Sequence, residues 1–369
     1  MEAPVGLADK IILFNVMCLS LLSFLAQLVE ATPEVQARID YWQQKFAGGP
    51  WNWITAADMR NLKGLGFQKQ MHDFDTVCQA AKFRVMYGPG GLTQKVIVER
   101  GEQINKSRSN CGDFGRLSLH DQWKSFGFTQ VLCSNADKLR NRGITNAAVR
   151  GAILGDALGA QRPLTWQEST KLRRNFQRVT VDMVRANLNY DWEARVRHKL
   201  ELLYPRTHSL YQATRLDGVR VMQNMRRVCK LLPPRVAFAQ LHTMFYGWCM
   251  SHRFGQKWRA CRLCLHTRSL GARGYDTLAH IPHCNVTKTL CEHLGIGGED
   301  WGLRQMLLMA KGLSDNTLCK ISLVNYGAYE SYNYALHVRK QRDLHATVES
   351  ALAHIREAAG SVAFDWNSC

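Results

Sequence analysis

Two pairs of metal-ligating side chains stand close together in the last third of the chain: Cys261 with Cys264, and His280 with Cys284. Their spacing is Cys-x2-Cys-x15-His-x3-Cys. A CxxC turn points two thiolates to one side, and His-x3-Cys places the second pair one helical turn apart. The glycine-rich stretch between the pairs allows them to converge. The sequence therefore predicts a tetrahedral Zn²⁺ site formed by these four residues.

Further ligand types near this motif leave alternatives open. His283 could replace His280, and His266, Cys291 and His293 lie close by in the sequence. A redox pair or two unrelated cysteines would also account for CxxC, although no βαβ pattern of the thioredoxin type frames it. Because four protein ligands leave no coordination position for water, we expect a structural site that orders its loop.

Positive charge is concentrated in one stretch of the 369-residue chain, whose formal net charge is +18. Residues 138–273 contain 26 Lys and Arg against 7 Asp and Glu, and 21 of these cations are Arg. Guanidinium groups fork onto phosphates and stack on bases, so this block predicts RNA or DNA as a partner. A solvated helical surface is the alternative interpretation. The expected phosphate contacts are Arg173, Arg174, Arg178, Arg226, Arg227 and Lys230.

Residues 11–29 form an uncharged apolar run that is about as long as a membrane span. Lys10 ahead of it also gives it the look of a signal peptide. Polar side chains such as Asn15 and Gln27 interrupt the run, and no cluster of positive charge sets an orientation. A helix buried on several sides explains it as well. The twelve cysteines show no regular disulfide spacing, which predicts a reduced, intracellular protein of the nucleus or cytoplasm.

Helix signals dominate the remainder of the chain. Thr165 and Glu168 are spaced as a capping box, and Pro233-Pro234 is typical of a helix start. The pattern predicts a mainly α, multi-helix assembly with a small zinc-ordered loop module. Further helices are expected over residues 300–313, 319–338 and 342–359.

The order of motifs around the metal ligands resembles the zinc-binding region downstream of the reverse transcriptase in LINE-like (non-LTR) retrotransposons. The segments that carry this resemblance are LPPRVAFAQL (232–241), FYGWC (245–249), Arg253 with Phe254, and Cys261 to Cys284, which includes DTLAHIPHC. The apolar segment 10–24 is similar to the thumb helix of those enzymes. The resemblance covers residues 8–45 and 230–290, and the middle of the chain only loosely.

The resemblance implies that the chain corresponds to the C-terminal, thumb-to-zinc-binding region of such an enzyme. The apolar run would then be buried against a polymerase, and the remainder of the reverse transcriptase would be a partner. The five expected regions are a thumb-like helical region (1–87), a Gly/Ser-rich linker (88–115), a basic helical region (116–230), the zinc-binding module (231–295) and a C-terminal helical region (296–369).

The sequence lacks the catalytic residues that the family's polymerase requires. The family's polymerase uses paired aspartates, and no Asp-Asp pair occurs in this sequence, so we expect no polymerase activity. In some relatives a nuclease follows the zinc motif, and Glu299, Asp300 and Lys311 are the nearest candidates here. Acids that open a helix are commonly partners of its dipole. A metal-dependent nuclease and a membrane-anchored helical protein are the alternatives to a nucleic-acid-binding remnant without catalysis.

Overall fold

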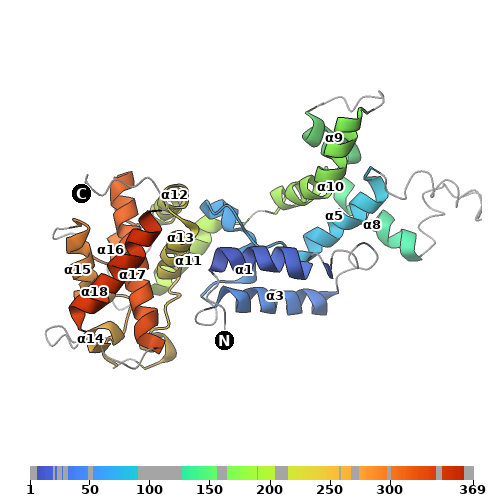
Figure 1. The fold of residues 1–369 in the computed structure, drawn as a ribbon. Helices are drawn as coiled ribbons and strands as arrows, with labels where there is room; N and C mark the ends of the chain where they lie inside the picture. The colour runs from blue at the N-terminus through green and yellow to red at the C-terminus, as the bar shows by residue number, and fades with distance from the viewer. Residues whose placement is uncertain are drawn as a thin grey trace, which may run out of the picture. The chain divides into compact units, whose positions relative to one another are not determined.

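The fold is helical throughout the part of the chain that the computed structural model describes (Figure 1). Its only other regular feature there is an isolated antiparallel bridge between Ala260 and Tyr275. The mainly α fold expected from the sequence is therefore confirmed. The described residues are 6–19, 21–22, 27, 32–48, 53–89, 127–155, 164–188, 190–203, 215–256, 259–266, 274–296, 301–337 and 343–360.

The chain divides into two compact units, and each is made of segments that are distant in the sequence. The first comprises Met1–Ile12, Trp42–Met71 and Asp191–Cys369, and the second comprises Leu13–Tyr41 and His72–Tyr190. The five regions expected from the sequence stay a prediction. Of the expected linker at 88–115, residues 90–115 lie outside the described part.

The second unit is built around one long amphipathic helix, α10 (Trp166–Ala186). Its side chains Leu172, Phe176 and Val184 are buried in a common core with Phe83 and Leu139. The expected capping box is present: the Thr165 hydroxyl accepts from the Glu168 amide at 3.2 Å, and the Glu168 carboxylate accepts from the Thr165 amide at 2.9 Å. Its other helices include η1 (Phe14–Cys18), α5 (Phe74–Tyr87), α8 (Gly127–Asn141) and α9 (Asn146–Leu154).

The first unit is organised by α17 (Asp315–His337), a largely buried helix against which most of the neighbouring helices pack. Pro234 begins one of them at its first helical position, as expected from the sequence. The neighbours are α12 (Arg215–Leu231), α13 (Pro234–Met244), α14 (Arg262–His266), α15 (Asn285–His293), α16 (Leu303–Met306) and α18 (Leu344–Ala359). Further helices of this unit include α4 (Ala56–Arg60), η2 (Leu62–Leu65), α11 (Trp192–Leu203), η4 (Ser251–Phe254) and η5 (Ile281–His283).

The apolar N-terminal run forms α1 (Leu7–Leu13), followed by the single π-helical turn η1; α3 (Pro33–Ala47) comes next. No helix among the residues that are described is both long enough and apolar enough to cross a membrane. Ile11 and Phe14 are buried, whereas Met17 and Leu21 are exposed. The described part of this run is therefore buried on one side within this chain, and the burial against a polymerase that the resemblance implies stays a prediction.

The helix expected over 300–313 is a short turn instead. The α-helix covers only Leu303–Met306, because the chain then turns through a left-handed residue, Leu308 (φ 60°). Side-chain amides satisfy the carbonyls that a continued helix would have bonded. Met306 O accepts from Gln240 at 3.0 Å and from Asn325 at 2.9 Å, and Leu308 O accepts from Asn224 at 3.0 Å. The sequence pattern misses this turn because the amides come from α12, α13 and α17.

Replacing Asn325 with leucine tests this network. Asn325→Leu removes both amide donations, one to Met306 O and one of 2.6 Å to the buried Gln240 Oε1. We expect the free energy of unfolding in urea to fall by about 1–3 kcal/mol, since a buried acceptor loses its donor. Asn316→Leu, an exposed change in the first turn of α17, should stay within about 0.5 kcal/mol. Equal effects of the two variants would contradict the network.

Candidate metal centre

The four predicted ligands come together in the first unit. Cys261 immediately precedes α14, Cys264 lies within that helix, His280 precedes η5, and Cys284 is the N-cap residue of α15. One ligand atom from each residue lies within 4.8 Å of the others. The three cysteines are buried, and His280 is half-buried. The structure therefore brings together the whole predicted set, and the described residues hold no other such group.

The distances fit a tetrahedral metal ion better than a disulfide. Zn–S and Zn–N bonds of about 2.3 and 2.0 Å place neighbouring sulfurs about 3.8 Å apart, and sulfur and nitrogen about 3.5 Å apart. Cys264 Sγ lies 3.6 Å from Cys284 Sγ and 3.3 Å from His280 Nε2. A disulfide would require about 2.0 Å, and the described cysteines are all free. The cluster can hold a metal such as zinc.

Three buried thiols that lie together do not all lose their protons unless a cation balances the negative charge. Hydrogen bonds from Cys261 and Cys284 lower the pKa of Cys264 far below its usual range, and hydrogen bonds with Cys264 and Cys284 raise the pKa of Cys261. Hydrogen bonding with Cys261 favours the Cys284 thiolate, but the bond to Cys264, burial and the Cys264 charge outweigh it and raise the Cys284 pKa to about 12. One sulfur can thus carry a charge alone, whereas three thiolates together need a cation among them.

Gly274 leaves the space that the ring of His280 occupies. A Cβ at Gly274 would come within 1.8 Å of His280 Nδ1, so only glycine leaves room for this ring. Gly274 O also accepts from the Cys261 amide at 2.9 Å, which ties the two halves of the motif together. His283, the alternative ligand, is exposed and outside the cluster. His293 is exposed on α15 with Nδ1 2.9 Å from Thr289 O.

A buried carboxylate connects the ligand-bearing loop to α17. Asp276 is 1 % exposed and accepts from the Ser251 amide at 2.7 Å and from the Tyr332 hydroxyl at 2.9 Å. Arg262 Nε lies 3.7 Å from the same carboxylate. Burial, followed by the Asp276 charge, raises the pKa of Tyr332 well above its usual range, so its hydroxyl stays a donor. No pattern in the sequence points to Tyr332, because its partner lies 56 residues away.

The six expected phosphate contacts fall into two groups, one in each unit. Arg173, Arg174 and Arg178 are exposed on α10 in the second unit. In the first unit Arg226, Arg227 and Lys230 lie on α12. Here Arg226 Nε donates to Gly64 O at 2.8 Å, and Arg227 pairs with Asp315 at 2.6 Å. These two guanidinium groups therefore already stabilise the fold.

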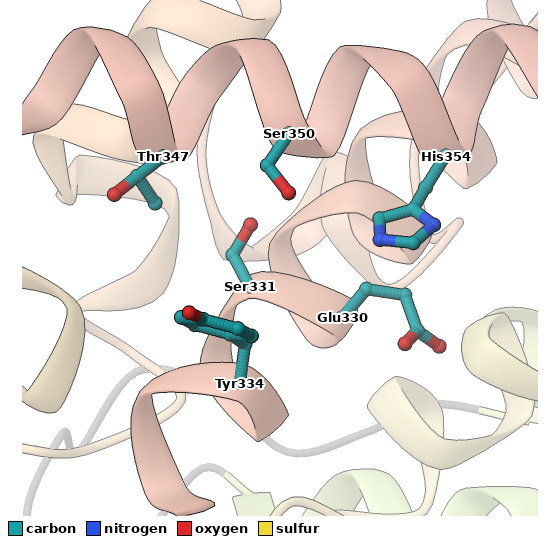
Figure 2. A pocket seen from close by; sticks show the side chains of 6 residues that line it. All are labelled: Glu330, Ser331, Tyr334, Thr347, Ser350 and His354. Atoms are coloured by element: carbon teal, nitrogen blue, oxygen red, sulfur yellow. The ribbon is translucent and has the colours of Figure 1, made fainter. Parts of the chain in front are cut away.

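The remaining candidates for chemistry are not assembled. Glu299 and Asp300 lie outside the described residues, and Lys311 is exposed after α16. A polar recess between α17 and α18 contains Ser350 and His354 opposite Glu330 (Figure 2). Burial raises the pKa of Glu330, yet no hydrogen bond joins these three side chains, all of which are described. They do not form a Ser-His-acid triad.

Metal content tests the cluster directly. We expect about one zinc per purified chain, measured by mass spectrometry of the metal, and none in the Cys261→Ser, Cys264→Ser double variant, because half of the ligands are removed. Cys291→Ala changes a buried cysteine of α15 outside the cluster and should keep the metal. Equal zinc in the double variant and in wild type would exclude this ligand set.

The link to α17 has its own test. Tyr332→Phe removes the hydroxyl that donates to Asp276 and leaves a buried charge with one donor fewer. We expect the free energy of unfolding to fall by about 1.5–3 kcal/mol, with faster loss of metal to a chelator. Tyr326→Phe removes the same group from the same helix without altering a hydrogen bond of Asp276, and should release metal at the wild-type rate. The link is refuted if both variants release metal alike.

Comparison of the chain with protein-family models, with curated proteins and with solved structures gave no match. The fold class and the cluster therefore rest on this chain's own residues. What they establish is a helical protein with a buried Cys3His group that can hold a metal ion.

Proposed function

We propose that this protein binds RNA or DNA, that Zn²⁺ orders its Cys3His module, and that it is a C-terminal remnant of a retroelement reverse transcriptase. The observation that carries the proposal is the Cys3His cluster, with ligand atoms within 4.8 Å. Four protein ligands leave no position for a reacting water, so the metal would hold a fold in shape. When bound, the ion would supply structural chemistry: the thiolates of Cys261, Cys264 and Cys284 would hold it, their charge would be neutralised, and their loop would be fixed.

The proposal for the partner rests on charge. The surplus of cations over residues 138–273 exceeds what the internal ion pairs of the described residues use. Arg173, Arg174 and Arg178 are the strongest candidates because they are exposed on one helix. Arg227 is weaker, because Asp315 and Leu313 O already hold its guanidinium. Lys230 is exposed at the end of α12.

No polymerase activity is included in the proposal, since the sequence lacks an Asp-Asp pair. The remainder of a reverse transcriptase would be a natural partner, and the exposed apolar side chains Met17 and Leu21 offer it a surface. The free thiols of the described cysteines favour a reducing, intracellular setting.

Salt dependence of nucleic-acid binding tests this function. Affinity for an oligonucleotide, measured by fluorescence anisotropy, should fall steeply between 50 and 200 mM salt. With six or more phosphate contacts the expected loss of affinity is about a thousandfold. The Arg173→Ala, Arg174→Ala, Arg178→Ala variant should bind more weakly. On a single strand, the slope of the logarithm of affinity against the logarithm of salt concentration should become shallower by about 2, which is about 0.7 for each lost contact.

A variant with the same change in charge serves as the control. Lys288→Ala, Lys311→Ala, Arg356→Ala also removes three exposed cations, but from the first unit and outside the basic face of α10. It should retain most of the wild-type affinity. An affinity that does not depend on salt, or equal losses in both triple variants, would contradict the assignment of phosphate contacts to α10.

A further inference from the structure

Trp166 is the most exposed of the large apolar side chains described, at 81 %. It occupies the first turn of α10, where the capping box of Thr165 and Glu168 fixes the start of the helix. Leu172 and Phe176, about 120° and 80° around the helix from Trp166, anchor the helix in its core. The exposed indole is therefore held on a rigid element, with its apolar surface in water.

Cations follow Trp166 along the same helix. Arg173 comes seven residues later, which places it about 10 Å along the axis and within about 20° of Trp166 around it. Lys171, Arg174 and Arg178 form a strip about 80–140° around the helix from Trp166, and their long side chains extend from that side. From Trp166 to Arg178 the helix rises about 18 Å, the length of about five nucleotides stacked at 3.4 Å.

These cations are not used by the fold. The side chains of Lys171, Arg173 and Arg174 are exposed and make no hydrogen bond or ion pair with the described residues. Arg178 bonds only Asn175, one turn before it on the same helix, at 2.8 Å. Among the acids of α10, Glu168 is held in the capping box and Asp182 is the exposed one. The strip therefore has a clear positive surplus facing solvent.

We propose that this face of α10 binds single-stranded nucleic acid, with Trp166 stacked on an unpaired base and the arginines on the adjoining phosphates. A duplex hides the faces of its bases, so an exposed indole gains little from it. Single strands offer these faces, and stacking on an aromatic ring strengthens their binding whatever the base. The inference rests on the proposed function and deepens it: it names the strandedness of the ligand and a residue that contacts bases.

Binding of the full-length protein to two probes tests the inference. The probes are a 12-nucleotide oligo-dT and a 12-base-pair hairpin duplex, measured by anisotropy at one salt concentration. Trp166→Leu should weaken oligo-dT binding about tenfold, as expected for the loss of one stacked base, and change duplex binding less than twofold. Trp166→Phe keeps an aromatic face and should stay within about threefold of wild type. Leu188→Ala, at an exposed residue just beyond α10, is the control and should bind as wild type.

The outcomes separate this inference from the function on which it rests. If Trp166→Leu binds oligo-dT as wild type does, or weakens duplex binding equally, the stacking proposal is overturned. The proposed function then still stands, provided that the α10 arginine variant weakens binding. If wild type binds neither probe, both fall, and an acidic protein surface becomes the candidate partner. Far-ultraviolet circular dichroism should be unchanged in Trp166→Leu, because the side chain is exposed.

Discussion

Three buried sulfurs and one imidazole lie together in the first unit, in an arrangement that can hold a metal ion. Cys261 and Cys284 are fully buried, and the ligand atoms of the cluster lie within 4.8 Å of one another. Burial of apolar surface alone does not account for such a cluster. A divalent cation bound there would resolve the conflict between burial and ionisation, because it would neutralise the thiolates in place. The consequence extends beyond the loop. Asp276 hydrogen-bonds Tyr332, and Tyr332 belongs to α17, the helix around which the unit packs.

The described arginines of this chain, whose net charge is +18, fall into two groups: those that bond within a unit and those that are exposed. Some stabilise the first unit: Arg195 donates to the buried Asp58 carboxylate at 2.7 Å, and Arg220 reaches Met309 O at 2.9 Å. Their removal would take a donor away from each of these acceptors, which costs stability whether or not a ligand is present. The exposed arginines of α10 have no such internal role. A surplus of positive charge in the sequence therefore indicates a ligand only when the cations that bond within the fold have been subtracted.

Local signals in the sequence predicted the features that neighbouring residues determine. The capping box of Thr165 and Glu168, the helix start at Pro234 and the Cys3His ligand set all depend on spacings of a few residues or on a turn. The spacing predicted His280 as the histidine ligand, but it does not show the space that Gly274 leaves for the His280 ring. The turn at Leu308 was likewise missed, because Asn224 and Gln240 stabilise it from other helices. These features depend on packing between segments that are distant in the sequence, so the periodicity of the sequence could not predict them.

The metal centre requires that one ion be bound by three sulfurs and one nitrogen. X-ray absorption at the zinc edge of the purified protein is the decisive experiment, because it reports the kind, number and distance of the bound atoms. We predict three sulfur atoms at about 2.3 Å and one nitrogen at about 2.0 Å, with no bound water. A shell dominated by nitrogen or oxygen, or two sulfurs with two lighter atoms, would contradict this ligand set.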